Sequence, residues 1–91
     1  MAVTIRIPTQ LRELAGGAGE VALEGGTIAE LLTALDAANP GFAERLYGED
    51  GELRRFVNVF LDDEDIRFLD GIATAVSDGQ VVSIIPAVAG G

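Results

Sequence analysis

The chain contains no cysteine and no histidine, and all six of its basic residues are arginines. Without cysteine there is no disulfide, no thiolate ligand and no thiol nucleophile, and without histidine the other usual zinc ligand is missing. The many carboxylates also have no His, Lys or Cys to complete an acid–base pair. We therefore expect no metal site and no intrinsic catalytic activity.

Positive charge is scarce, since 15 acidic residues against six arginines leave a net charge of −9. Binding to nucleic acid or to an anionic membrane depends on cations that contact phosphates. The composition argues against both kinds of partner and favours a protein partner with a basic face.

Long hydrophobic runs are absent too, and none approaches the roughly 20 residues of a membrane-spanning helix. The first residues, MAVTIRIP, alternate apolar and polar side chains, whereas a signal peptide has a basic start and a continuous apolar stretch. We expect a cytoplasmic protein. Its 91 residues, 48% of them hydrophobic, are enough for one domain with a single modest core.

Alternation of apolar and polar residues predicts a strand at 3–7 and a short second strand around Val21 and Leu23. The glycine-rich segment 16–19, GGAG, lies between them and predicts a hairpin loop. A phosphate-binding loop is the alternative. It is disfavoured because the lysine of a P-loop and the strand-then-helix context of a dinucleotide turn are both missing.

A helix is predicted to begin after Thr27, because Thr27 and Glu30 form a capping box that satisfies backbone N–H groups at a helix start. Five apolar residues then follow at helical spacing and line one face: Ile28, Leu31, Leu32, Leu35 and Ala38. Residues 39–41, Asn-Pro-Gly, end the helix.

The remaining pattern predicts a short helical turn and polar loop at 42–55, then strands at 56–61, 65–71 and 80–86. The last strand is almost entirely apolar, which favours a central strand covered on both faces. Pro86 has no backbone N–H, so sheet pairing should weaken there. One main helix on a mixed sheet makes an α+β domain over residues 1–86.

The turn Asp62–Asp65, DDED, offers four carboxylates, which are the ligands that Ca²⁺ and Mg²⁺ prefer. It lacks the alternating ligand spacing of an EF-hand loop. We interpret it as a solvated turn that keeps the sheet soluble.

Two aromatic residues, Phe56 and Phe60, fall on the same face of their predicted strand, and the aliphatic residues Val57, Val59 and Leu61 fall on the other. If the aliphatic face packs on the helix, the aromatic face is an outward apolar patch suited to docking a partner. The alternative is that both faces are covered within the domain.

The last residues, PAVAGG, form an uncharged segment from Pro86 to Gly91. Five extended residues reach roughly 17 Å, so a flexible tail at 87–91 can carry a terminal carboxylate into a site on another protein. A narrow channel can close around the backbone of Gly90 and Gly91, because glycine has no Cβ. Ordering the tail costs about 5–10 kcal/mol of backbone entropy, which the folded body must offset. The alternative is a frayed end or an expression scar.

Partner contacts are therefore expected from four residues that lead to the glycines: Pro86, Ala87, Val88 and Ala89.

The segments RFVNVFLDDEDIRFLDG and DGQVVSIIPAVAGG resemble the ThiS/MoaD sulfur carriers, which have the β-grasp, ubiquitin-like fold. The resemblance implies that an ATP-dependent activating enzyme, E1-like or MoeB-like, adenylates the carboxylate of Gly91. Sulfide then converts it to a thiocarboxylate.

Within the family, the chain looks most similar to carriers of actinobacterial cysteine synthesis. These imply a PLP-dependent cysteine synthase acting on O-phosphoserine, and a zinc metalloprotease that releases the cysteine. ATP, PLP and zinc then belong to partner enzymes. The small subunit of molybdopterin synthase and the thiamin sulfur carrier are alternatives with another acceptor enzyme. From another class, a ubiquitin-like modifier or interaction module would join its carboxylate to an amine.

Overall fold

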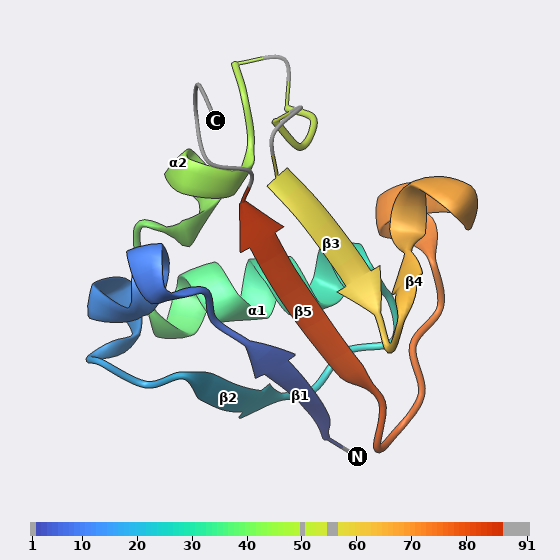
Figure 1. Cartoon of the computed structure of the whole chain (residues 1–91), viewed down its shortest axis with the longest axis horizontal. Helices are drawn as coiled ribbons and strands as arrows, with labels where there is room; N and C mark the ends of the chain where they lie inside the picture. The colour runs from blue at the N-terminus through green and yellow to red at the C-terminus, as the bar shows by residue number, and fades with distance from the viewer. Residues whose placement is uncertain (1, 50, 55–56, 87–91) are drawn as a thin grey trace.

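The computed structural model describes residues 2–49, 51–54 and 57–86. Their strands form one mixed sheet, and α1 lies across one face of it (Figure 1). The strands are β1 (Val3–Arg6), β2 (Glu20–Leu23), β3 (Val57–Leu61), β4 (Glu64–Asp65) and β5 (Val81–Pro86). The helices are α1 (Ile28–Ala38) and α2 (Phe42–Leu46), with 3₁₀ helices η1 (Thr9–Ala15), η2 (Ile66–Phe68) and η3 (Gly71–Ala73). The predicted α+β architecture is confirmed.

The strand order is β2-β1-β5-β3-β4, in which β5 pairs in parallel with β1 and antiparallel with β3. The prediction that the last strand is central is therefore confirmed. The prediction that both of its faces are covered is wrong. Val82 and Ile84 are buried, whereas Ile85 is 49% exposed, because α1 covers only one face of the sheet. None of the helices among the described residues has the length and hydrophobicity needed to cross a bilayer.

Helix α1 begins where the capping box predicts, although Glu30 binds the residue before the N-cap Thr27. The Thr27 hydroxyl accepts from the backbone N–H of Glu30 at 3.2 Å, and the Glu30 carboxylate accepts from the N–H of Gly26 at 2.6 Å. The helix ends at Ala38, directly before the Asn-Pro-Gly signal. The prediction that Ala38 belongs to the buried face is wrong, since this last helical residue is exposed.

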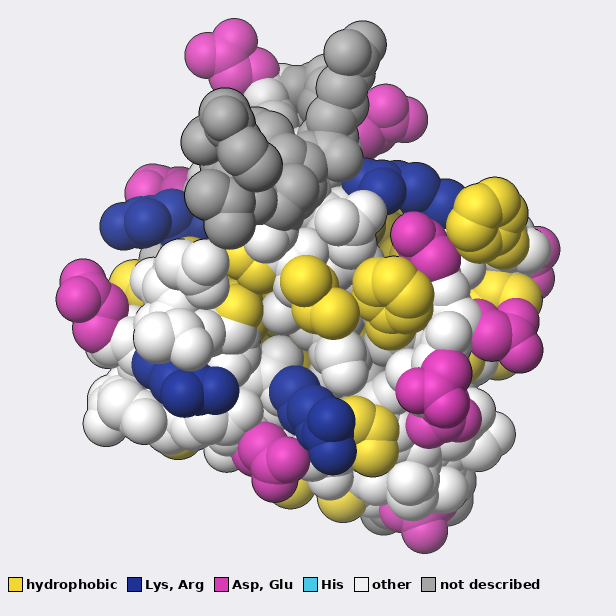
Figure 2. Space-filling model, viewed as in Figure 1, with side chains coloured by type: hydrophobic (Ala, Val, Ile, Leu, Met, Phe, Trp, Pro, Cys, Tyr) yellow, Lys and Arg dark blue, Asp and Glu magenta, His cyan; other side chains and the backbone are white. Residues whose placement is uncertain are grey.

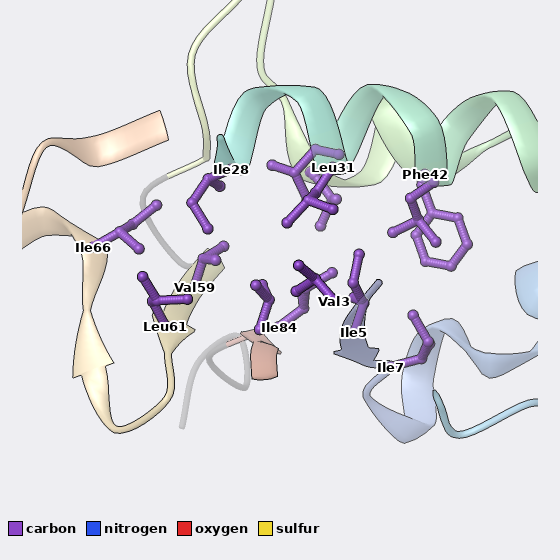
Figure 3. Close-up of a cluster of buried hydrophobic side chains, with 14 of the residues drawn as sticks. Val3, Ile5, Ile7, Ile28, Leu31, Phe42, Val59, Leu61, Ile66 and Ile84 are labelled. Atoms are coloured by element: carbon purple, nitrogen blue, oxygen red, sulfur yellow. The ribbon is translucent and has the colours of Figure 1, made fainter. Parts of the chain in front are cut away.

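The core lies between α1 and the sheet. Figure 3 shows Ile28 and Leu31 of α1 facing strand residues such as Ile5 and Val59, with Phe42 of α2 at one end. Each large side chain that is fully buried contributes about 1.5–3 kcal/mol. The covered face therefore carries the stability of the fold and leaves the opposite face available for other roles.

The predicted strand at 65–71 is wrong beyond its first residue. Asp65 ends β4, and its carboxylate accepts from the backbone N–H of Arg67 at 2.8 Å. This local hydrogen bond turns the chain into η2 and places Ile66 in the core.

The loop between β1 and β2 contains η1, which the glycine pattern did not predict. Buried Leu11 anchors this 3₁₀ helix to the core. It ends at Gly16, where a φ of 67° requires left-handed backbone that favours glycine. The prediction that segment 16–19 is a turn is confirmed.

Candidate functional site

The sheet face turned away from α1, here called the open face, is formed by alternate residues of the strands. In β3, the aliphatic residues Val57, Val59 and Leu61 are buried, so Asn58 and Phe60 point to the open face. The predicted division of β3 into two faces is confirmed. Phe56 lies outside the described residues, and its share in the patch stays a prediction.

Apolar side chains meet in the middle of the open face. Phe60 pairs with Ser83, and Asn58 pairs with Ile85. Phe60 is therefore a diagonal neighbour of both Val81 and Ile85, within reach of an aromatic ring. Figure 2 shows hydrophobic side chains gathered at the centre of this face. We call Phe60, Val81 and Ile85 the open-face patch.

Arg67 borders this patch and is held in place by β3. Its Nη1 donates to the side-chain oxygen of Asn58 at 2.6 Å, and its Nη2 donates to the carbonyl of Val57 at 2.8 Å. The next residue, Phe68, is 86% exposed. A fixed cation and an exposed aromatic ring beside an apolar surface are the residue types that proteins use to anchor partners.

Strand β5 loses one of its two neighbours before it ends. Its parallel pairing with β1 stops at Ser83, whereas its pairing with β3 continues to Pro86, opposite Val57. Pairing on the β1 side is thus lost earlier than predicted, because the chain has turned at Pro8 into η1.

The lost pairing leaves an open groove of about 360 Å³ beside the end of β5. Arg6 and Arg12 line one side of it, and Ile85 and Pro86 line the other. We call it the terminal groove.

Pro86 is half-buried and is the last residue of β5, at the position that the sequence predicts. Ala87, Val88, Ala89, Gly90 and Gly91 lie outside the described residues, so their expected roles stay predictions. The buried side chains of Val82 and Ile84 anchor β5 to the core. The point from which the chain continues to Gly91 is therefore fixed by the central strand of the sheet.

The acidic turn holds the sheet together at the opposite end of β5. One carboxylate oxygen of Asp62 accepts from the backbone N–H of Val81 at 3.1 Å, and the other accepts from the Gln80 amide at 3.0 Å. Asp62, Asp63 and Glu64 are exposed, in agreement with a solvated turn. Within the described part of the chain, no group of three or more acidic side chains is placed to hold a metal ion.

Sequence reasoning missed Ile85, Phe68 and the terminal groove. The alternation of Val81, Ser83 and Ile85 was the available signal for an exposed face, but the continuous apolar run concealed it. Phe68 was assigned to a strand that ends at Asp65. The groove depends on where β1 leaves β5, and no short sequence pattern encodes that.

Three comparisons place this geometry among known proteins. A model of the ThiS family matches residues 5–91. The chain is 47% identical over 93 residues to the sulfur carrier protein CysO of Mycobacterium tuberculosis, covering all of both chains. A chain in the crystal structure of the Amycolatopsis orientalis BexX/CysO complex is similar with a TM-score of 0.92 and 43% identity, over 99% of this chain and 100% of that one. The small archaeal modifier protein 3 of Haloferax volcanii is 46% identical over 65 residues, 71% of this chain and 70% of its own.

The structural match over 99% of the chain confirms the expected β-grasp fold. The relatives are named as carrier or modifier proteins and not as enzymes.

Proposed function

The chain belongs to the ThiS family of sulfur carriers, and on that premise we propose that it bears its sulfur on the carboxylate of Gly91. One observation carries the proposal: the family match extends through Gly91 in a chain that contains no cysteine. A carrier without a thiol has no side chain on which to hold sulfur as a persulfide. Acyl chemistry at the terminal carboxylate remains as the covalent route.

In the proposed reaction, a carboxylate oxygen of Gly91 attacks the α-phosphorus of ATP bound to an activating enzyme, and pyrophosphate leaves. Sulfide then attacks the acyl carbon of the adenylate, and AMP leaves with the oxygen that joined the two. The product is a thiocarboxylate, in which one sulfur replaces one oxygen. The chain contributes the acyl group and its positioning, and the partner supplies the chemistry.

The folded body is proposed to supply the affinity that the last residues lack. Ordering residues 87–91 costs about 5–10 kcal/mol of backbone entropy, and their small side chains offset little of it. The open-face patch lies in the same sheet as the end of β5, and Arg67 of η2 is hydrogen-bonded to β3 of that sheet. Docking through this face therefore allows the partner to hold the body while the terminal carboxylate reaches its active site.

We propose that the sulfur is used in cysteine synthesis, a role supported by the 47% identity to CysO over the full length of both chains. The acceptor is then a PLP-dependent cysteine synthase that uses O-phosphoserine, and a zinc metalloprotease releases the product. ATP, PLP and zinc are proposed to be bound by these partner enzymes. The complex of a CysO with BexX supports the use of a CysO-like body as a docking module.

A second function, protein modification, is favoured by the 46% identity to a small archaeal modifier protein. In that case an amine, and not sulfide, attacks the activated carbonyl of Gly91. The absence of lysine means that the chain cannot form lysine-linked chains of itself. The two functions use the same activated carboxylate and differ in the nucleophile.

Incubation with the activating enzyme, ATP and sulfide tests the proposal by intact mass. The chain is expected to gain the mass difference between one sulfur and one oxygen atom, and a variant without Gly91 is expected to gain nothing. Ala37→Val, a change at an exposed position of α1, serves as the control and should load normally. A mass gain in the variant without Gly91 would contradict the proposal, whereas conjugation to proteins in place of sulfur gain would favour the modifier function.

A further inference from the structure

The terminal groove has a charge opposite to that of the chain. Acidic residues outnumber arginines 15 to six in the sequence, yet the described residues that line this groove include two arginines and no acid. Figure 2 shows arginine side chains on the open face, around its hydrophobic centre. An acidic chain thus presents a local cationic surface beside the end of β5.

The guanidinium of Arg12 is fixed in a position from which it can bind an anion. Its Nε donates to the carbonyl of Ile7 at 3.1 Å, and its guanidinium lies against Gly19, where an added Cβ would be 3.4–3.6 Å away. Among the described residues it has no ion pair with an acidic side chain. A guanidinium that is fixed through Nε keeps its remaining N–H donors for a carboxylate or a phosphate.

Arg6, the second cation of the groove, is only weakly engaged. Its Nε lies 3.5 Å from the Glu20 carboxylate, and both side chains are about 60% exposed. Such exposed pairs contribute little and exchange readily for another anion.

The position of the terminal groove on the folded body indicates which anion it binds. The groove lies beside Pro86, five residues before Gly91 along the chain. The proposed reaction places the Gly91 carboxylate inside the partner's active site, so a groove on the folded body faces the partner's surface around that site and not the nucleotide. Carboxylate side chains on the partner's surface are the anions that remain within reach of Arg6 and Arg12.

We propose that the terminal groove binds acidic side chains that a partner enzyme places around the entrance to its active site. This inference rests on the proposed function and adds how the carrier is oriented when it docks on its partner. Arginine and carboxylate form paired hydrogen bonds with defined geometry. Acids elsewhere on the carrier would repel the same carboxylates, so the groove fixes which end of the carrier faces the entrance.

Kinetics of sulfur loading test this inference. With the activating enzyme, ATP and sulfide, Arg12→Gln is expected to raise the KM for the carrier about tenfold and to leave kcat unchanged. Arg12→Lys should recover part of the loss. Gln10→Glu places a negative charge at an exposed residue that lines the groove and leaves Arg12 unmutated. The added charge repels the partner's carboxylates and should also raise the KM for the carrier. Arg45→Gln and Thr33→Glu make the same charge changes at exposed positions on α2 and α1.

The inference is overturned if the wild-type chain loads sulfur and both groove variants have the KM of their matched controls. A kcat that falls as much as kcat/KM in Arg12→Gln would also overturn it, because docking strength alone should not alter the chemical step. Failure of the wild-type chain to load sulfur would contradict the proposed function itself, so the two results are distinguishable. Thermal denaturation of each variant establishes that it is folded.

Discussion

Two neighbouring isoleucines on β5, Ile84 and Ile85, lie on opposite faces of the same sheet and allow a matched test of the open face. Ile84 is 2% exposed in the core, whereas Ile85 is 49% exposed. Replacing each by alanine removes the same atoms from the same strand. Any difference in effect therefore reports the difference between the two faces.

The magnitudes follow from burial. Ile84→Ala leaves a cavity beneath α1 and is expected to lower the free energy of unfolding by about 2–5 kcal/mol. Ile85 keeps about half of its surface in water, so its truncation should lower the free energy of unfolding by about 1 kcal/mol or less. For a domain of this size, each kcal/mol shifts Tm by about 4–8 °C.

Urea unfolding followed by far-UV circular dichroism measures both variants without needing tryptophan, which the chain lacks. The m-value should be unchanged, so that the midpoints report stability alone. In the sulfur-loading assay, Ile85→Ala should raise the KM for the carrier while remaining folded. An equal loss of stability in the two variants would refute the reasoning, because it would mean that Ile85 is covered within the domain.

Three further predictions concern the supports of the fold. One carboxylate oxygen of Asp36 accepts from two backbone N–H groups at the start of α2, at 2.9 and 3.1 Å. Asp36→Ala removes this oxygen and should lower the free energy of unfolding by about 1–2 kcal/mol. Asp36→Asn keeps an oxygen at this position and should lower the free energy of unfolding less. Gly41→Ala should lower the free energy of unfolding by about 2 kcal/mol or more in the same urea assay, because φ at Gly41 is 115° and the new Cβ would lie 3.0 Å from Leu14. Gly51→Ala, with open space around the new Cβ, should lower the free energy of unfolding by about 1 kcal/mol. Burial raises the pKa of Tyr47 above 10.0, so the folded state keeps the phenol proton to higher pH than the unfolded state. The resulting stabilisation is complete below pH 10 and is lost as pH rises further, and urea midpoints of Tyr47→Phe should lack this loss.

The sequence predicted well the elements whose signals are local. The capping box of Thr27 and Glu30 and the Asn-Pro-Gly stop bounded α1 correctly, because both depend on hydrogen bonds and backbone limits within a few residues. The alternation in β3 likewise identified the outward position of Phe60. These signals act over the length of one element.

Features that depend on several elements were not predicted. The apolar run of β5 indicates burial on both faces, yet Ile85 is exposed because the main helix covers only one of them. Strand β4 stops after two residues because the Asp65 carboxylate binds the N–H of Arg67 and turns the chain. The terminal groove arises where β1 departs at Pro8 while β5 continues to Pro86.

These features indicate separate roles for the two faces of the sheet. The covered face stabilises the domain, and the open face and terminal groove offer hydrophobic and cationic contacts around the end of β5. If the proposed function holds, each partner enzyme can use the same contacts on the folded body.

Locating the transferred sulfur within the chain tests the proposed chemistry most directly. After loading with the activating enzyme, ATP and sulfide, fragmentation in a mass spectrometer separates pieces that contain Gly91 from those that do not. We expect every fragment that contains Gly91 to carry the added mass, and every fragment that ends before it to carry none. Added mass on a fragment that lacks Gly91 would contradict the proposal that this chain carries sulfur on its terminal carboxylate.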